Sequence, residues 1–507
     1  MKLRYVFSEM PYVMALKFSM LQKRCSFCGL DVTEQGDNRV ACDRECHFVV
    51  YCSQACLQSD RLFHRFECQA IRGGSFLKEP DLLDVRLLGR LAARYRLDNG
   101  IAVLSSDFPS HMIENRSFDD LMTHEREFRS MFAREQHLKK IKTAFYEFFK
   151  DTELALASGS SLRKFYYRLR INGFAFSERK KQYLDRQQLG ESVYLNASRF
   201  DHSCRPSCLY RFEGCRIIIE YIDHETADAT PISFTKEEFE NLTLSYGFGT
   251  RCNYGTGCSM TDQRMTSLEI RYFFACRCVL CSDKGLDEIQ HDAAPVECDQ
   301  CGAPYVWRRR FVLGTMRLKK SCLCKGDKGS VSEDSEKTAA RFGKESSRQV
   351  KYLLQKWPKV MTQLMEDKMS KDTIQRCLAF LNLADKYWHP LYNLRLGQLH
   401  EKIFAAMYAL YFSDRHDFTG EKHDLDIMLK SGEVFLNIYA TYFEAYMMTV
   451  ADYAVEIAKL HKLRSTVEDL EQCERWCNFA VKAYMDRGEV KRANFIKQLL
   501  GTTPIKE

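Results

Sequence analysis

The chain has no long apolar run, and this absence excludes the simplest class of membrane protein. Its 507 residues contain no apolar stretch of the length, about 20 residues, that spans a bilayer as a helix. The first 21 residues include Glu9, Pro11 and two lysines, and therefore lack the pattern of a secretory signal peptide. We expect no membrane association and a reducing compartment for the 22 cysteines.

A strong excess of one charge is also missing. Lys and Arg number 75 against 68 Asp and Glu, which gives a formal net charge of +7. We find no compact basic cluster beyond residues 308–310. Because nucleic-acid-binding domains usually concentrate basic residues on one face, this composition does not favour direct nucleic-acid binding. The hydrophobic fraction of 45% is ordinary for a globular protein, and the length predicts several domains.

What the sequence does have is cysteine in short-spaced pairs near its start. Eight candidate ligands follow the patterns CxxC, CxxxC, CxxxC and HxxxC, namely Cys25, Cys28, Cys42, Cys46, Cys52, Cys56, His64 and Cys68. Two such side chains a few residues apart meet one zinc ion from a tight turn or a single helical turn. The set therefore predicts two tetrahedral zinc sites. Disulfides or free buried thiols are the weaker alternative, because no secretion signal accompanies the pattern.

This arrangement resembles a MYND zinc finger, in which two sites interleave along the chain. The resemblance implies one site made by Cys25, Cys28, Cys52 and Cys56, and another made by Cys42, Cys46, His64 and Cys68. The family usually has CxxC where this chain has Cys42-Asp-Arg-Glu-Cys46, and His47 is a competing ligand. The polarity of 54–65 predicts a short helix that carries Cys56 and His64. MYND fingers bind short peptides or pack as a rigid module.

A second cysteine constellation lies farther along the chain. Alone, the segment Asp201-His202-Ser203-Cys204 is a turn with a spare thiol, but a CxCxxC triplet follows more than 70 residues later. Four sulfur ligands, Cys204, Cys276, Cys278 and Cys281, predict another tetrahedral site that pins two remote segments together. Two further pairs, Cys298 with Cys301 and Cys322 with Cys324, fit zinc and unligated thiols equally well.

The pattern of apolar residues changes along the chain. Helical spacing predicts helices over 82–95 and 118–156. Short β-branched runs such as 215–222 predict strands in the region that follows. A polar stretch over 319–348 predicts a loop or linker. The remainder, from 352 to 500, has an almost entirely helical pattern that resembles stacked tetratricopeptide-like pairs.

Together the motifs resemble those of the SET- and MYND-domain lysine methyltransferases over nearly the full length. The resemblance implies an α+β protein: a SET-domain β-fold with an inserted MYND finger and a post-SET zinc site, followed by an all-α tetratricopeptide-like C-terminal domain. The implied divisions are a partial N-terminal SET segment (1–24), the MYND finger (25–68), a helical linker or SET insert (69–160), the SET core (161–250), an insertion with the post-SET zinc motif (251–285), a cysteine-containing polar connector (286–350) and the helical C-terminal domain (351–507).

The resemblance implies an S-adenosylmethionine-dependent protein-lysine N-methyltransferase that acts on histone or other protein substrates. The implied catalytic and lysine-channel residues are Tyr246, Tyr272 and Phe174. The implied cofactor-binding residues are Asn172, Asp201, His202, Tyr246 and Phe274. An aromatic channel suits this reaction, because flat walls orient the aliphatic lysine stem and retain cation–π contact with methylated product.

Two departures from the family pattern predict weakened activity. Asp201 stands where the family has asparagine, so the amide donor is lost and a negative charge is added. No glycine precedes Gly29, whereas family members open with a glycine-containing turn that cradles the cofactor, so the sequence either lacks the natural start or belongs to a divergent member. We expect weak S-adenosylmethionine binding and slow turnover. The alternative is a catalytically weak or inactive zinc-binding adaptor that recruits partners through the finger and the helical domain.

The expected cofactors are S-adenosylmethionine and three Zn²⁺ ions. The expected partners are a lysine-bearing protein substrate, such as a histone tail, and peptides bound by the finger. We expect a monomer that resides in the nucleus, the cytoplasm or both. The target lysine and the degree of methylation are not predicted, because the shape of the pocket sets them.

Overall fold

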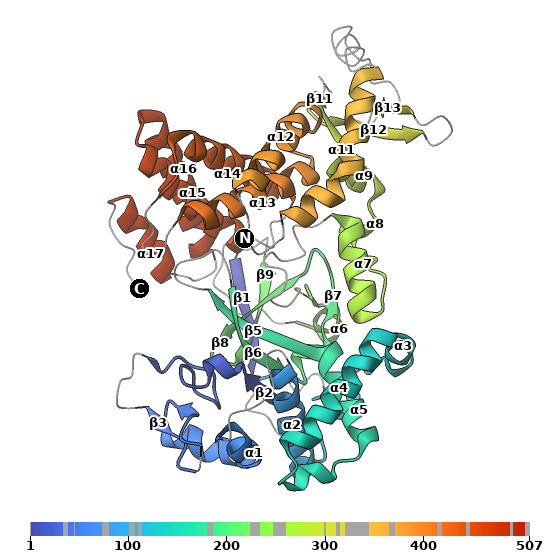
Figure 1. Cartoon of the computed structure of the whole chain (residues 1–507), viewed down its shortest axis with the longest axis vertical. Coiled ribbons are helices and arrows are strands. Elements are labelled where there is room, and N and C mark those ends of the chain that lie inside the picture. Colours follow the sequence, from blue (N-terminus) through green and yellow to red (C-terminus); the bar gives the residue numbers. More distant parts are fainter. Residues whose placement is uncertain are drawn as a thin grey trace. The chain divides into compact units, whose positions relative to one another are not determined.

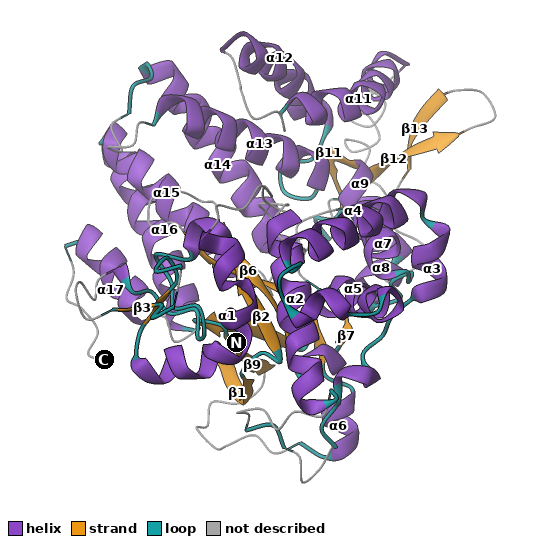
Figure 2. Ribbon diagram, turned by 60° about the horizontal axis from the view of Figure 1, so that its bottom comes forward, coloured by secondary structure: helices purple, strands orange, loops and turns teal. Residues whose placement is uncertain are grey.

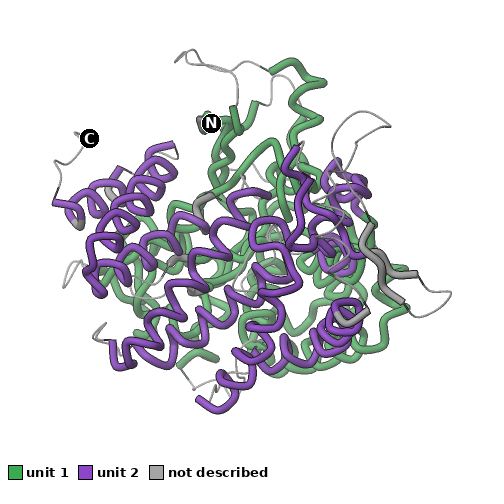
Figure 3. The backbone as a smooth tube through the Cα atoms, turned by 90° about the horizontal axis from the view of Figure 1, so that it is seen from above, with its two compact units in different colours: residues 1–253, 267–275 green, residues 254–266, 276–507 purple. Residues whose placement is uncertain are grey.

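The computed structural model describes residues 2–33, 39–44, 46–72, 81–100, 107–109, 114–179, 186–223, 234–246, 260–298, 301–310, 315–319, 344–364, 371–412, 418–442, 447–486 and 490–501. The chain divides into two compact units, which Figure 3 shows in green and purple. Unit 1 comprises residues 1–253 and 267–275, and unit 2 comprises residues 254–266 and 276–507.

Unit 1 contains two antiparallel three-stranded sheets whose strands come from distant parts of the chain (Figure 1). Their orders are β1-β9-β8 and β2-β6-β5. The strands are β1 Lys2–Glu9, β2 Val13–Leu16, β5 Gly173–Arg179, β6 Arg186–Val193, β8 Cys208–Glu213 and β9 Arg216–Asp223. Lys2 pairs with Asp223 and Val13 with Val193, so the first strands are completed by segments that follow the cysteine-rich region.

The strand predicted over 215–222 is confirmed as β9, and the register explains its apolar side chains. Ile217 and Ile219 are fully buried in one cluster with Phe7 of β1. All four residues of β2 are buried, because β6 covers one edge of this strand and helix α2 (Asp81–Asp98) packs against it. Gly190 of β6 is required here, since a Cβ atom would lie 2.2 Å from the Ala15 carbonyl oxygen.

Helices fill the rest of unit 1. They are α1 Gln54–Arg72, α2, α3 Glu125–Ser130, α4 Phe132–Phe148, α5 Gly159–Asn172 and α6 Lys236–Glu240, with short 3-10 turns η1 Phe18–Met20, η3 Phe118–Asp120, η4 Glu153–Leu156 and η5 Ala197–Arg199. The predicted helix over 82–95 is confirmed as α2, which is buried on all sides from 82 to 93. The predicted helix over 118–156 is interrupted, because His124 is left-handed and Met131 is extended.

Two pairings of two-residue strands and one helix at the boundary between the units complete the elements of this region. Strands β3 Val40–Ala41 and β4 Val50–Tyr51 pair with each other, and β7 Asp201–His202 runs parallel to β10 Thr243–Leu244. Helix α7 Thr261–Tyr272 runs from unit 2 into unit 1 along the chain.

Unit 2 is dominated by consecutive helices, as the C-terminal pattern predicted. They are α8 Val279–Ser282, α9 Lys284–Asp292, α11 Lys344–Gln363, α12 Lys371–Tyr387, α13 Leu394–Tyr411, α14 Lys422–Tyr442, α15 Met447–Arg464, α16 Val467–Met485 and α17 Val490–Leu499. From α11 to α17, each helix packs against the helix that follows it along the chain. In this described part, no helix has the length and apolarity needed to cross a membrane.

One sheet in unit 2 was not predicted. Strands β11 Ala293–Glu297, β12 Pro304–Arg310 and β13 Thr315–Lys319 form the order β11-β12-β13, visible as orange arrows in Figure 2. This sheet lies where the sequence suggested a polar connector. The signal for it in the sequence was a run of three aromatic or branched residues, from Tyr305 to Trp307, and the structure buries all three. A run this short does not distinguish a strand from a loop.

Candidate functional site

The first group of finger cysteines converges in unit 1. The ligand atoms of Cys25, Cys28, Cys52 and Cys56 all lie within 4.8 Å of one another. The Sγ atoms of Cys28 and Cys52 are 3.5 Å apart, close to the edge of about 3.8 Å of a tetrahedron with zinc–sulfur bonds of about 2.3 Å. A hydrogen bond from Cys28 lowers the pKa of the Cys25 thiol to about 5. Cys25 is therefore the member of this group whose thiolate form, the form that zinc binds, is favoured, whereas the neighbouring thiols and burial raise the pKa values of Cys28 and Cys56.

Two glycines fix this cysteine turn against the sheet. Gly29 and Gly214, the latter in the turn between β8 and β9, both have positive φ angles, +73° and +59°. A Cβ atom on Gly214 would lie 2.2 Å from the Cys28 carbonyl oxygen, which accepts a 2.7 Å hydrogen bond from the Cys215 N–H. The close approach of the two turns requires glycine and holds the first zinc group on the end of the β8–β9 hairpin.

The second group combines three cysteines with one histidine. The ligand atoms of Cys42, Cys46, His64 and Cys68 lie within 4.8 Å of one another, and His64 Nε2 is 3.1 Å from the Cys42 Sγ atom. His47, the competing candidate, lies outside this group. Its Nδ1 atom is 3.2 Å from the Cys42 carbonyl oxygen. The geometry thus brings Cys42 into the ligand set despite its longer spacing to Cys46.

A buried ion network connects the second group to the core of unit 1. Glu67 on α1 receives hydrogen bonds from the guanidinium groups of Arg86 (2.9 Å) and Arg90 (3.0 Å) on α2. Asp60 also pairs with Arg90 at 2.8 Å, and all four side chains are at most 4% exposed. Burial opposes ionisation, yet the two arginines hold the pKa of Glu67 well below its ordinary value. The Nδ1 atom of His64 lies 3.6 Å from this carboxylate.

A third cysteine group matches the second constellation in the sequence. The ligand atoms of Cys204, Cys276, Cys278 and Cys281 lie within 4.8 Å of one another. Arg264 is buried near this group, with a guanidinium nitrogen 3.7 Å from the Cys281 Sγ atom. The three groups together offer a Cys₄, a Cys₃His and another Cys₄ ligand set, which are the ligand sets of structural zinc.

The further cysteine pairs remain a prediction. Cys298 is buried and Cys301 is exposed, while Cys322 and Cys324 lie outside the described residues.

Four of the predicted site residues lie together in unit 1, whereas no ring contact among the described residues joins Phe174 to them. The Tyr246 ring centroid is 5.0 Å from that of Tyr272, 6.1 Å from that of Phe274 and 5.3 Å from that of His202. The Tyr246 hydroxyl donates a 3.0 Å hydrogen bond to the Phe200 carbonyl oxygen. Its backbone N–H donates to His202 Nδ1 at 2.9 Å. These contacts join the turn around β7 to the segment that follows β10.

A second aromatic pair includes a residue that the sequence reasoning missed. Phe174 packs edge-to-face against Tyr210 of β8, with ring centroids 5.6 Å apart. Burial is the main cause that raises the pKa of Tyr272 to about 12, and the nearby Tyr210 phenol adds to it. Tyr210 therefore contacts one predicted channel residue, Phe174, and acts electrostatically on another, Tyr272. In the sequence, Cys208, Tyr210 and Phe212 occupy every second position of β8. This alternation predicts a strand but no functional role for Tyr210.

The predicted cofactor residues have different surroundings. Asp201 is exposed on β7, whereas Asn172 is 8% exposed at the end of α5. The Asn172 side-chain amide donates to the carbonyl oxygens of Met122 and Arg168, both at 2.9 Å. This amide is engaged in holding the end of α5.

Glu9 holds the main chain that leads into this site. Its two carboxylate oxygens accept hydrogen bonds from the N–H groups of Asn196 (3.1 Å) and Ala197 (3.0 Å), at the start of η5. From the opposite side, the Arg116 N–H donates to the side-chain oxygen of Asn196. Glu9 is fully buried, and burial raises its pKa to about 7, although the two backbone contacts and the charge of Arg199 oppose the shift.

This raised pKa predicts a specific dependence of stability on pH. The folded chain keeps a proton on Glu9 up to about pH 7, whereas the ordinary pKa is 4.5. The stability gained from this proton is complete below the ordinary pKa and is lost as pH rises through 7, a change of about 3 kcal/mol. A Glu9→Gln variant has no titrating carboxyl at this position and therefore lacks this dependence of stability on pH. In urea unfolding at pH 4.5 to 7.5, followed by circular dichroism, the wild type should lose stability relative to this variant, and parallel profiles would contradict the assignment.

Comparison with known proteins agrees with these groups of residues. Residues 25–68 match the family model "MYND finger". The chain is 24% identical over 277 residues to "Histone-lysine N-methyltransferase SMYD3" of Mus musculus, covering 51% of this chain and 56% of that protein. It is 22% identical over 287 residues to "Histone-lysine N-methyltransferase SMYD1" of Homo sapiens (56% and 52% covered).

A plant relative gives the same result. The chain is 23% identical over 300 residues to "Histone-lysine N-methyltransferase ASHR1" of Arabidopsis thaliana, covering 58% of this chain and 54% of that protein. The chain thus spans about half the length of the curated relatives that it matches.

Proposed function

We propose that this chain, a member of the SET- and MYND-domain protein family, is an S-adenosylmethionine-dependent protein-lysine N-methyltransferase with weakened cofactor binding. The observation that carries the proposal is the convergence of Tyr246, Tyr272, His202 and Phe274, which come from separate segments of the chain. In this proposal unit 1 contains a SET fold, and Cys204 with the CxCxxC triplet makes its post-SET zinc site.

The acceptor side of the proposed site consists of aromatic walls. Phe174, Tyr246 and Tyr272 would enclose the aliphatic stem of the target lysine and exclude water from its amine. A neutral amine is the nucleophile in methyl transfer, so a water-poor aromatic wall favours the reactive form. Proximity and alignment supply most of what such a reaction needs from a protein.

The two phenols serve as neutral hydrogen-bond donors and not as bases. Burial and the nearby Asp201 carboxylate raise the pKa of Tyr246, and burial raises that of Tyr272 to about 12. The Tyr246 proton is directed at the Phe200 carbonyl oxygen. Both rings therefore remain uncharged at physiological pH, and the lysine ammonium would lose its proton to solvent before it enters the water-poor channel.

The chain's residues also fit the cofactor on the other side of the site. When bound, S-adenosylmethionine supplies an electrophilic methyl group on a sulfonium. The Asp201 carboxylate would accept hydrogen bonds from its ammonium group, and the ring of Phe274, 5.9 Å from the His202 ring, would lie against its adenine. Asp201 cannot donate as an asparagine amide can, so at least one cofactor contact is lost.

The zinc ions in this proposal are structural. Each of the three groups offers four protein ligands, and a closed coordination shell leaves no position for substrate or water. The Glu67 carboxylate lies 3.6 Å from the Nδ1 atom of His64. It would orient the imidazole ring from this side while the other ring nitrogen binds zinc.

The finger would also bind peptide partners. Unit 1 contains a cavity of about 550 Å³ next to the finger, within the range that holds small ligands or side chains. Phe27, Leu30 and Phe63 of the finger line it together with Met10 and Tyr12. We further propose a monomer that methylates histone or other protein lysines in the nucleus, the cytoplasm or both.

Calorimetric titration with S-adenosylmethionine and S-adenosylhomocysteine tests the proposal. We expect weak binding by the wild-type chain and binding tighter by about 10-fold or more in an Asp201→Asn variant, because the amide restores a donor and removes a charge. A Glu147→Gln variant is the matched control, since it also removes one carboxylate charge but at an exposed position on α4, and it should leave cofactor binding unchanged. Methyl transfer to a histone mixture, followed by mass spectrometry, reports turnover.

The outcomes separate the proposal from its alternative. Tight binding by the unaltered chain would contradict the weakened-cofactor argument and leave an ordinary methyltransferase. No binding by either form would favour a zinc-binding adaptor that recruits partners through the finger and the helical domain.

A further inference from the structure

The cavity beside the finger contains an arginine that is held in place and still has donors to offer. Arg94 of α2 lines this cavity, and its side chain is 26% exposed. Its guanidinium carbon lies 5.3 Å from the ring centroid of Tyr12 and 6.0 Å from that of Phe63. An arginine that stacks on aromatic rings has lost much of its freedom before a ligand arrives, so binding costs less entropy.

One edge of this guanidinium is already occupied. The Nε atom donates to the Asp98 carboxylate at 2.7 Å, and this carboxylate also accepts from the Tyr12 hydroxyl (2.8 Å) and the Gly100 N–H (2.9 Å). Three donors therefore fix Asp98, and Asp98 fixes Nε. Within the described part of the chain, no hydrogen bond engages the terminal nitrogens Nη1 and Nη2 of Arg94. These two nitrogens form an edge that binds a carboxylate through two parallel hydrogen bonds.

The remaining charges of the cavity do not oppose an entering carboxylate. The charged side chains that line it are Arg90, Arg94, Arg216, Asp60 and Glu213. Each of the two carboxylates has a cation of its own. Asp60 pairs with Arg90 at 2.8 Å, and Glu213 pairs with Arg211 at 2.5 Å. A third carboxylate therefore meets Arg94 and Arg216 beside two anions that are already neutralised.

The rest of the cavity wall is apolar. It includes Met10, Val13 and Met14 from β2 and the segment before it, and Phe27, Leu30 and Phe63 from the finger. We propose that the cavity binds peptide segments in which an acidic residue adjoins a large apolar one. The carboxylate pairs with Arg94, and the apolar side chain fills the space between the finger and β2. The inference rests on the peptide-binding part of the proposed function, and it names the chemistry of the peptide.

Blocked peptides separate the carboxylate from simple apolar burial. Three peptides with the sequence Gly-Leu-Xaa-Gly, where Xaa is Glu, Gln or Lys, carry an acetylated N-terminus and an amidated C-terminus, so the terminal charges are absent. Each is titrated by calorimetry into the full, zinc-loaded chain at low salt. We expect the Glu peptide to bind about 10-fold more tightly than the Gln peptide, because the hydrogen bonds are charge-assisted, and the Lys peptide to bind most weakly. Equal binding of the Glu and Gln peptides would overturn the inference.

A free organic acid tests the kind of ligand. The probe is 4-methylpentanoate, which combines a carboxylate with a branched apolar chain. We expect it to bind more weakly than the Glu peptide, because it lacks the peptide backbone and part of the apolar contact. If it binds as tightly or more tightly, the cavity is a site for small organic acids and the proposal of a peptide ligand fails.

Variants locate the binding. Arg94→Gln should abolish the preference for the Glu peptide, whereas Arg94→Lys should keep only part of it, because an ammonium group has no planar fork. Arg96→Gln is the matched control and should keep the full preference. It lies on the same helix, loses an exposed ion pair with Glu153 and does not line the cavity. Leu30→Ser should weaken the Glu and Gln peptides equally, because the 48% exposed Leu30 offers only apolar surface. Full preference in a folded Arg94→Gln variant, verified by circular dichroism, would refute the assignment.

Cofactor titration of the same variants keeps the inference apart from the proposed function. Arg94 and Leu30 lie outside the proposed methyl-transfer site, so both variants should bind S-adenosylmethionine as the wild type does. If no form binds cofactor but the Glu peptide is still preferred through Arg94, the methyltransferase proposal fails and the inference stands. If methyl transfer occurs while the Glu and Gln peptides bind equally, the inference fails and the methyltransferase proposal stands.

Discussion

A Glu67→Gln substitution is expected to destabilise unit 1 by about 3 to 5 kcal/mol, the usual cost of removing one partner from a buried ion pair. Glu67 and Asp60 together balance Arg86 and Arg90, and all four are buried. Glutamine has the same shape, so no cavity forms. The loss comes from leaving a buried guanidinium without its counter-charge, where Arg86 also donates to the Leu16 carbonyl oxygen of β2.

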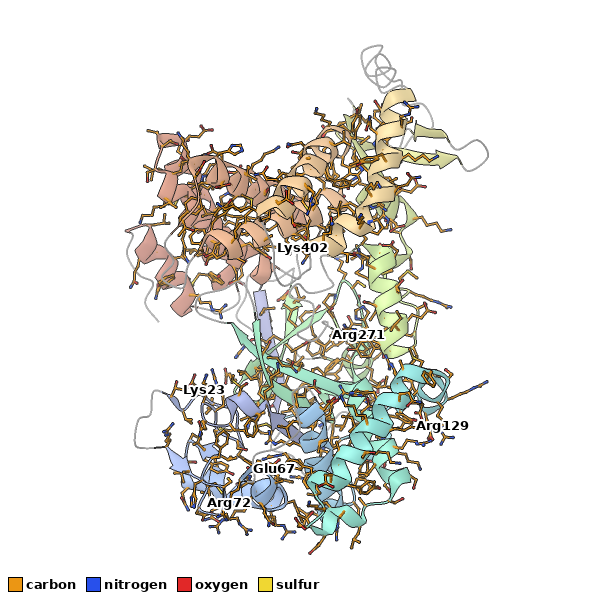
Figure 4. The ribbon with its side chains drawn as sticks, viewed as in Figure 1. Lys23, Glu67, Arg72, Arg129, Arg271 and Lys402 are labelled. Carbon is orange, nitrogen blue, oxygen red and sulfur yellow. The ribbon has the colours of Figure 1, made fainter. Side chains whose placement is uncertain are left out.

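The measurement is urea unfolding of the wild type and the variant, followed by far-ultraviolet circular dichroism. The matched control is Arg129→Gln, which removes an exposed ion pair with Glu125 on α3 and should cost no more than about 0.5 kcal/mol. Figure 4 labels Glu67 and Arg129, so both positions can be compared. All four tryptophans lie in unit 2, so their fluorescence reports separately on that unit. A loss below about 1 kcal/mol for Glu67→Gln would show that the network contributes little.

Removal of zinc should have the largest effect on the finger. Structural zinc contributes an apparent binding free energy of about 10 to 16 kcal/mol in small zinc domains, and that energy is folding energy. Among its described residues, the finger's regular secondary structure consists of the short strands β3 and β4 and the helix α1, so much of its order depends on the ligand groups. A strong chelator should therefore unfold residues 25–68, which limited proteolysis with mass spectrometry would detect. A finger that stays resistant after complete metal loss would contradict a structural role.

The number of zinc ions bound per chain tests whether Cys42 or His47 is a ligand in the second site. Metal analysis should find three ions per wild-type chain, one fewer in Cys42→Ser, and three in His47→Ala, because His47 Nδ1 faces the Cys42 carbonyl oxygen and not the ligand group. The reverse result, with zinc lost only from His47→Ala, would place His47 in the second site.

The sequence predicted the parts of this site that are encoded by local spacing. Pairs such as Cys25 with Cys28 meet within one turn, so their approach depends on few backbone angles. The helix that carries Cys56 and His64 was predicted over 54–65, and α1 is longer but begins at the same residue. The roles of Tyr246 and Tyr272 came from a family resemblance and stay proposals.

The parts that the sequence did not predict depend on long-range pairing. Arg86 and Arg90 were two of four charged positions in a largely apolar helical pattern, and nothing local indicated that Glu67 would neutralise both. Glu9 approaches the start of η5 because β2, which follows Glu9, pairs with β6, which precedes η5. Contacts of this kind are set by the register of distant strands. A pattern read within one window of sequence does not contain that register.

The pairing of β1 with β9 also has a consequence for how the protein is made. Lys2 pairs with Asp223, so the ribosome must add roughly 220 residues after β1 before its partner exists. At about 5 to 20 residues per second, the wait is on the order of 10 to 40 seconds. Strand β2 waits almost as long for Val193. Both strands therefore emerge long before their partners, and their unpaired edges make the nascent chain aggregation-prone until β6 and β9 leave the exit tunnel.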